Sequence, residues 1–151
     1  MDYFNQRIMQ AEERIFSHVD LYQRPKLKED KHSSVVTVYN VHSVLGSNET
    51  KWVVGLISMK EDGHYYLEDT TYDVKISFAE LTWVEPDAYF TEMSVVMAQG
   101  RYHNAMFYIS RVQHPPLFQN KAFKFQQNES DYFGSYVKMT ESFILKNKYQ
   151  H

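Results

Sequence analysis

The chain has 151 residues and no cysteine, and its length is typical of one domain that buries a substantial core. Hydrophobic residues make up 43% and charged residues 23%, which excludes a repetitive or largely disordered protein and leaves no apolar run that could span a membrane. The missing thiols exclude disulfides and thiolate metal sites and favour a reducing compartment, and the net charge of −3 argues against a generally cationic nucleic-acid binder.

The first element that the sequence predicts is a helix over residues 2–19. Its apolar residues recur at spacings of three and four, which places them on one face, and Asp2 is a suitable N-cap. We expect this face to be buried against a barrel, whose open end a helix could cover, or against a neighbouring domain. The residues expected to be buried are Phe4, Ile8, Ile15 and Val19.

A polar connector over residues 23–34 leads to a second, shorter predicted helix. Thr37 can cap it, Val38, Val41 and Leu45 share a face, and Gly46 suits the left-handed conformation that ends a helix.

From residue 52 to residue 113 the pattern changes to that of strands. Predicted strands at 51–60 and 64–71 meet at Glu61-Asp62-Gly63, a strong hairpin signal. Further strands are predicted at 72–78, 94–102 and 105–113, with an irregular crossover at 79–90 that forms a short helix or an ordered loop. Three strands in a meander, a crossover and a hairpin predict a five-stranded OB-type Greek-key barrel, in a mostly β chain that is α+β overall with its flanking N-terminal helices.

Two glycines and two prolines refine this prediction. Gly55 and Gly100 lie inside strand patterns, where glycine marks a bulge or a sharp bend. After Pro115 and Pro116 no sustained period remains. We therefore expect three parts: helix, connector and short helix at 1–50, the barrel at 51–116, and an extended tail at 117–151.

No residues assemble a predicted active site. Asp62-Gly63 is explained by turn chemistry, and Glu68-Asp69 can cap the next turn by accepting backbone N–H bonds. The seven histidines show no metal-ligand spacing, and no nucleophile or phosphate-loop motif occurs. We expect a protein that is not an enzyme and has no cofactor or metal; a small hydrolase is the least favoured alternative.

Single-stranded DNA binding is the stronger alternative, because OB barrels stack bases on aromatic side chains above a basic groove. The barrel region supplies the aromatics but not the charge: between Lys51 and Gln113 it has five basic and nine acidic residues. Since phosphate neutralisation dominates such binding, a barrel of this charge is a poor candidate. The aromatic residues in question are Tyr65, Tyr66, Tyr72, Tyr102, Phe107 and Tyr108.

The segments also resemble, in collinear order, the second subunits of DNA polymerase epsilon. The resemblance begins at YFNQRIMQAEERIFSH, is strongest over VVGLISMKEDGHYYLEDTTYDVKISF and YFTEMSVVMAQGRYHNAMFYISRVQHPP, and ends near DYFG at 131–134. The turn at 69–73 departs from the family by lacking its glycine.

The resemblance implies an OB domain set against a phosphoesterase-like domain that has lost its metal ligands, toward which the tail at 117–151 would lead. Such a nuclear accessory subunit binds the C-terminal domain of the catalytic subunit and helps to dock the polymerase on components of the replicative helicase, with at most a weak DNA contact and no membrane. It is a scaffold in DNA replication rather than an enzyme.

Two places are predicted to bind the protein partner, because they gather large apolar side chains around irregular backbone. One is the crossover and the other is the exit from the last strand; Trp83 could instead plug an end of the barrel. The predicted contact residues are Leu81, Trp83, Tyr89, Phe90, Pro115 and Pro116.

Overall fold

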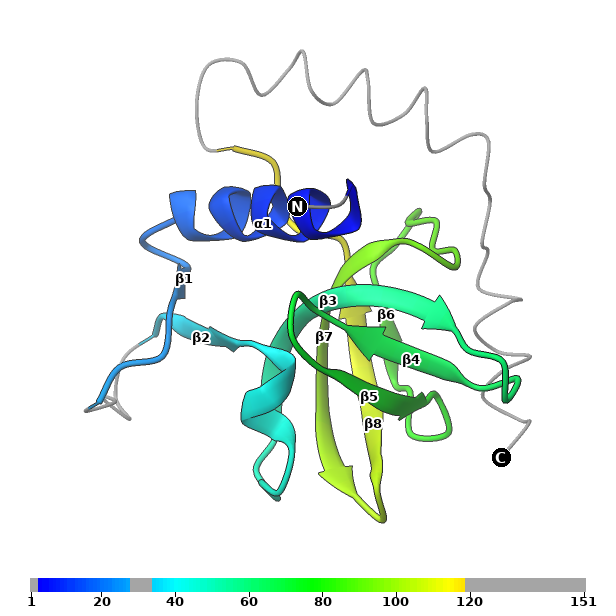
Figure 1. The fold of residues 1–151 in the computed structure, drawn as a ribbon. Helices are drawn as coiled ribbons and strands as arrows, with labels where there is room; N and C mark the ends of the chain where they lie inside the picture. The colour runs from blue at the N-terminus through cyan, green and yellow to red at the C-terminus, as the bar shows by residue number, and fades with distance from the viewer. Residues whose placement is uncertain (1–2, 28–33, 119–151) are drawn as a thin grey trace.

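Five strands form a closed barrel in the computed structural model, which describes residues 3–27 and 34–118 (Figure 1). The strands are β3 (Lys51–Met59), β4 (Tyr65–Glu68), β5 (Asp73–Ser77), β7 (Val95–His103) and β8 (Met106–Gln113). β3, β4 and β5 form an antiparallel meander, and β7 pairs antiparallel with both β3 and β8. The parallel pairing of β5 with β8 closes the ring. This is the order of an OB barrel, and the predicted fold is confirmed.

The hairpin between β3 and β4 forms at the predicted turn. The Lys60 N–H donates to the His64 carbonyl at 3.1 Å, and the Gly63 N–H donates to the Lys60 carbonyl at 3.0 Å. Gly63 has a φ of 80°, a conformation that glycine adopts without steric cost. The Asp62 carboxylate accepts from the His64 N–H at 2.9 Å, so the acidic residue serves the turn.

The predicted bend at Gly100 is also present. The register between β7 and β8 shifts between Gln99 and Gly100, as in a β-bulge. A Cβ atom at Gly100 would overlap the carbonyl oxygen of Tyr108. Only glycine therefore allows β8 to approach β7 this closely.

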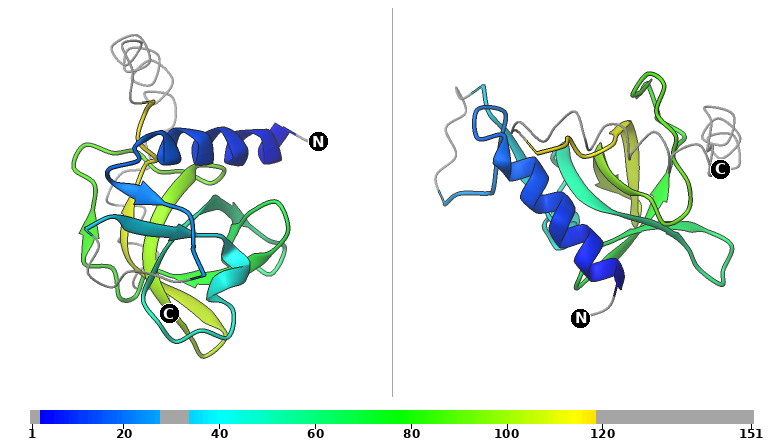
Figure 2. Two further views of the ribbon diagram at one scale, coloured as in Figure 1. Left: turned by 90° about the vertical axis from the view of Figure 1, so that its left-hand side faces the viewer. Right: turned by 90° about the horizontal axis from the view of Figure 1, so that it is seen from above.

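The buried side chains form two clusters, because β3 and β7 are covered on both faces. Along β3, Val53 and Ile57 point into the barrel, whereas Val54 and Leu56 belong to the cluster on its outer wall. The outer cluster is completed by the helix α1 (Tyr3–Ser17), which lies across this wall (Figures 1 and 2). A strand buried on both faces has a continuous apolar run instead of an alternating one.

The burial of α1 confirms half of the prediction. Ile8 and Ile15 are buried, but Phe4 is 39% and Val19 71% exposed. Val19 follows the end of the helix at Ser17, and Phe4 in the first turn belongs to neither apolar cluster. The helix also covers the outer wall rather than an open end of the barrel.

The predicted helix beginning at Thr37 is wrong. Thr37 lies in a strand, β2 (Val36–Tyr39), which pairs parallel with β3 on one side and with β1 (Tyr22–Gln23) on the other. A short 3₁₀ helix, η1 (Val41–Val44), follows, and the Asn40 side chain caps it by accepting from the Ser43 N–H at 3.0 Å. The alternating β-branched residues of 36–38 favour the strand.

The crossover between β5 and β7 is an ordered loop with a two-residue strand, β6 (Trp83–Val84), which pairs parallel with β8. Within the described residues no helix is long and apolar enough to cross a membrane. Most of the predicted tail at 117–151 lies outside the described residues.

Candidate interaction surfaces

The outer face of β4 and β5 carries the polar side chains that an OB barrel would offer to a ligand. Lys60 bridges two carboxylates that are opposite each other in the β4–β5 pair: its Nζ lies 3.1 Å from Glu68 Oε2 and 3.1 Å from Asp73 Oδ2. Hydrogen bonds to Glu68 and then to Asp73 raise the pKa of Lys60. The one cation at the centre of this face is therefore already paired.

The aromatic side chain on this face is engaged as well. The Tyr66 hydroxyl donates to Asp62 Oδ2 at 2.6 Å, and Lys60 Nζ lies 5.6 Å from the centre of the Tyr66 ring. The hydrogen bond from Tyr66 lowers the pKa of Asp62, and the same bond raises the pKa of Tyr66. Tyr66 is thus tied to a carboxylate and is not available as a free platform for a base.

An open hollow of about 590 Å³ lies at this end of the barrel. Three of its lining residues are acidic and one is basic; the lining consists of Met59, Lys60, Glu61, Asp62, Tyr66 and Asp73. Such a lining repels phosphate, so this hollow does not favour a nucleic-acid strand.

The turn after β4 shows what its acidic residue does. Asp69 Oδ1 accepts from the backbone N–H groups of Thr71 at 2.9 Å and Tyr72 at 3.0 Å, while Oδ2 accepts from the Val41 N–H at 2.8 Å. The expectation that this carboxylate caps the turn is confirmed. It also ties η1 to the barrel. In the described ranges no group of three His, Asp or Glu side chains could hold a metal ion.

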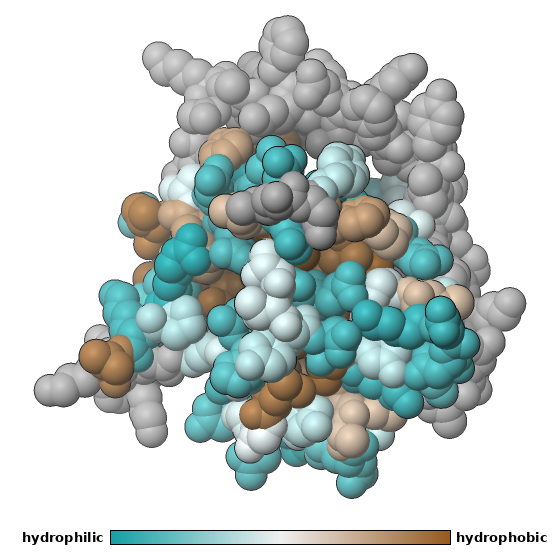
Figure 3. All heavy atoms as spheres, viewed as in Figure 1, coloured by the Kyte–Doolittle hydropathy of each residue, from teal (hydrophilic) through white to brown (hydrophobic). Residues whose placement is uncertain are grey.

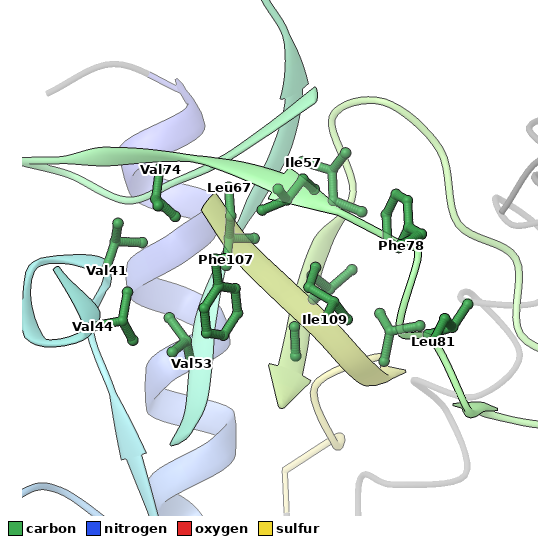
Figure 4. Close-up of a cluster of buried hydrophobic side chains, with 14 of the residues drawn as sticks. Val41, Val44, Val53, Ile57, Leu67, Val74, Phe78, Leu81, Phe107 and Ile109 are labelled. Carbon is green, nitrogen blue, oxygen red and sulfur yellow. The ribbon is translucent and has the colours of Figure 1, made fainter. Parts of the chain in front are cut away.

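Half of the predicted partner-binding residues lie in the interior. Leu81 is 6% exposed and Phe90 is fully buried in the inner cluster, and Pro115 is buried. Leu81 lies at the opposite end of that cluster from Val41 and Val44 of η1 (Figure 4). Their apolar character reflects the closing of the barrel, since the two ends of the ring need side chains from outside the strands.

Trp83 is half-buried on the outside of β8. Its ring lies under the exposed Arg111, whose guanidinium carbon is 4.8 Å from the ring centre. Arg111 was missed as a site residue because it follows Trp83 by 28 positions and only the parallel β6–β8 register joins them. Trp and Arg are the residues that most often dominate the energy of protein interfaces.

Tyr89 and Pro116 are half-buried near the exit of the last strand. The carbonyl of Tyr89 lies 2.7 Å from His114 Nε2, and the His114 ring stacks on Phe90. Burial lowers the pKa of His114. The crossover and the exit segment therefore form one packed region in which Trp83, Tyr89 and Pro116 reach the surface and the other predicted residues do not.

The surface as a whole offers no broad apolar plane on the side shown in Figure 3, where apolar side chains form separate spots among hydrophilic ones. The exposed large hydrophobic residues are Tyr3, Phe4, Met9, Val19, Leu21, Leu27, Met59 and Tyr72. Six of these eight precede residue 28, in α1 and the segment after it.

Comparison with known proteins gives two matches of different kinds. A family model described as "DNA polymerase epsilon subunit 2-like, OB-fold domain" matches residues 1–116. The chain is also 30% identical over 145 residues to the second subunit of DNA polymerase epsilon from Arabidopsis thaliana. That alignment covers 93% of this chain but 27% of the relative, so the chain spans about a quarter of the relative's length.

Two solved structures are similar at a lower level. The S. pombe Stn1–Ten1 complex matches with a TM-score of 0.42 and 12% identity over 72% of this chain and 97% of that one. The S. pombe telomere capping protein Ten1 matches with a TM-score of 0.42 and 11% identity over 65% of this chain and 97% of that one. Scores of this size carry no argument about this chain.

Proposed function

The chain belongs to the DNA polymerase epsilon subunit 2-like OB-fold family, and from this membership we propose that it acts in a non-catalytic accessory subunit of that polymerase. Its role is to hold the C-terminal domain of the catalytic subunit and to help dock the polymerase on the replicative helicase, in the nucleus. The observation that carries the proposal is the family match over residues 1–116, which includes α1 as well as the barrel.

The contact surface that we propose is the outer side of the crossover around Trp83. Its half-exposed indole and the guanidinium of Arg111 offer a rigid aromatic anchor beside a positive charge. Tyr89 and Pro116 extend this surface toward the exit segment. Leu81, Phe90 and Pro115 support it from within, because they are buried behind it.

Binding of single-stranded DNA is the less favoured function. On the outer face of β4 and β5, Lys60 is paired with Glu68 and Asp73, and Tyr66 is hydrogen-bonded to Asp62. A strand of DNA would have to break these contacts and bring phosphates toward several carboxylates.

The test is binding of the full chain to the C-terminal domain of a polymerase epsilon catalytic subunit. Trp83→Ala should weaken binding by about 1–2 kcal/mol, or roughly 5–30-fold in Kd, while circular dichroism shows a folded barrel. Tyr72→Ala is the matched control, because Tyr72 is an exposed aromatic residue on the turn between β4 and β5.

The outcomes separate the parts of the proposal. If the wild-type chain does not bind the catalytic-subunit domain but binds a labelled oligo(dT) at physiological salt, the accessory role is wrong and the DNA alternative stands. If Trp83→Ala binds as tightly as wild type, the contact surface is wrong and the accessory role is unaffected. If Trp83→Ala unfolds, Trp83 is a core residue.

A further inference from the structure

Two arginines lie two turns apart on one flank of α1. Arg7 is engaged: its Nη1 donates to the Met93 carbonyl at 2.7 Å, and its guanidinium lies 5.8 Å from the centre of the Tyr3 ring. Met93 has a φ of 77°, which is uncommon for a residue with a side chain. Arg7 thereby holds the end of the crossover against the helix.

Arg14 has no such partner. Its guanidinium is half-buried, its Nε is fully shielded, and within the described ranges that atom makes no hydrogen bond and no carboxylate lies within ion-pair distance. Burial, and then the positive charge of Arg7, lower the pKa of Arg14. The helix C-terminus favours a cation in the last turn, but it supplies no acceptor for this side chain. A partly buried charge without a counter-ion is unfavourable.

The surroundings of Arg14 are well ordered by other contacts. His18, one turn further on, lies with its Nε2 2.5 Å from the Leu117 carbonyl, which fixes the exit segment beside the end of the helix. The positive charge of Arg14 also lowers the pKa of the buried His114, a smaller effect than burial itself. Arg14 is therefore held between α1 and the exit segment.

Apolar side chains project into solvent at both ends of the same helix. Tyr3 and Phe4 lie in its first turn with their rings 5.6 Å apart, and Val19 and Leu21 follow its last turn. An unpaired cation between exposed apolar groups matches a ligand that carries both negative charge and apolar side chains.

We propose that this flank of α1 binds an acidic, partly apolar peptide segment of another protein, and that one of its carboxylates pairs with Arg14. The charge complementarity favours a peptide over a nucleic acid, because Arg14 is the cation left without a partner on this flank and a nucleic-acid strand needs several. A carboxylate can accept two parallel N–H bonds from one guanidinium. This site goes beyond the proposed function, since it uses residues other than those of the crossover surface and does not require the polymerase.

The experiment uses the full chain and a short fluorescein-labelled peptide of Glu and Leu, with the same peptide carrying Gln in place of Glu as a control. Fluorescence anisotropy should show that the acidic peptide binds, and that Arg14→Met weakens binding by about tenfold. Met keeps much of the apolar stem and removes the charge. Arg101→Met is the matched control, because Arg101 is an exposed arginine on β7, and it should leave the peptide affinity unchanged.

A second measurement separates a docking role from a structural one. Because Arg14 lacks a counter-ion in the described structure, Arg14→Met should keep or raise the melting temperature. A lower melting temperature would overturn the proposal, because Arg14 would then stabilise the fold itself.

Three binding results would also overturn it: equal binding of the acidic peptide by wild type and Arg14→Met, equal binding of the Glu and Gln peptides, or displacement of the peptide by oligo(dT). The last would assign the flank to nucleic acid. Trp83→Ala should bind the peptide normally, so failure of this site and failure of the crossover surface are distinguishable.

Discussion

The two walls of the barrel differ in what covers them. The wall of β3 and β7 is buried on both faces, with the inner cluster on one side and α1 on the other. The wall of β4 and β5 is buried on its inner face alone and presents Tyr66, Glu68, Asp73 and Lys60 outward. The comparison shows that one barrel sequence contains two kinds of strand, and that the absence of alternation in β3 signals a second layer.

The covered wall should be far more sensitive to truncation than the open one. Leu56→Ala removes a fully buried side chain beneath α1 and should lower the free energy of unfolding by about 2–5 kcal/mol, because a cavity forms between helix and strand. Lys75→Ala, on the outer side of β5, should change it by less than about 0.5 kcal/mol. Urea unfolding measures both; similar losses would show that α1 does not cover this wall in solution.

Acid should act first where the covered wall meets the exit segment. Burial lowers the pKa of His114, so the folded state holds the ring neutral; Glu85, Arg14 and the Tyr89 carbonyl face it. The unfolded chain takes up the proton near pH 6.5, so stability is full above that pH and declines as pH falls from there toward the folded pKa.

The measurement is the urea midpoint at pH 7.5 and pH 5.5. His114→Gln should flatten the decline, and His64→Gln, at the exposed β3–β4 turn, should leave it unchanged. A decline that is the same in wild type and His114→Gln would assign it to other groups.

The smallest effect is expected on the open wall. Lys60→Met leaves Glu68 and Asp73 facing each other, yet it should cost no more than about 1 kcal/mol, because the ion pairs are solvent-exposed and screened. The cost should shrink as salt is added. Since the pKa of Lys60 is raised, its contribution is full below about pH 10 and is lost as pH rises further. A loss as large as that of Leu56→Ala would contradict the contrast between the walls.

The sequence predicted the barrel well because its strands depend on local signals. The alternation of 73–77 and the Asp62-Gly63 turn are visible without knowing any distant contact. The strand β2 was taken for a helix because Val38, Val41 and Leu45 fit a helical spacing equally well, and what decides the matter is the parallel pairing with β3, which is not local.

The site was less predictable for the same reason. Leu81 and Phe90 share the apolar character of interface residues, and only the closed ring shows that they fill its interior. The contact between Trp83 and Arg111 depends on the β6–β8 register. Arg14 is notable for lacking a partner, and the absence of a tertiary contact leaves no pattern in a sequence.

The position of α1 has a consequence for synthesis on the ribosome. The helix is made first, but part of the wall that covers Ile8, Ala11 and Ile15 comes from Val95 and Met97 of β7. Residue 95 follows residue 15 by 80 positions, so at about 5–20 residues per second the apolar face of the helix waits roughly 4–16 s for its partners. During that interval the nascent chain exposes an amphipathic helix to the cytosol, which makes this segment the natural point of contact for chaperones.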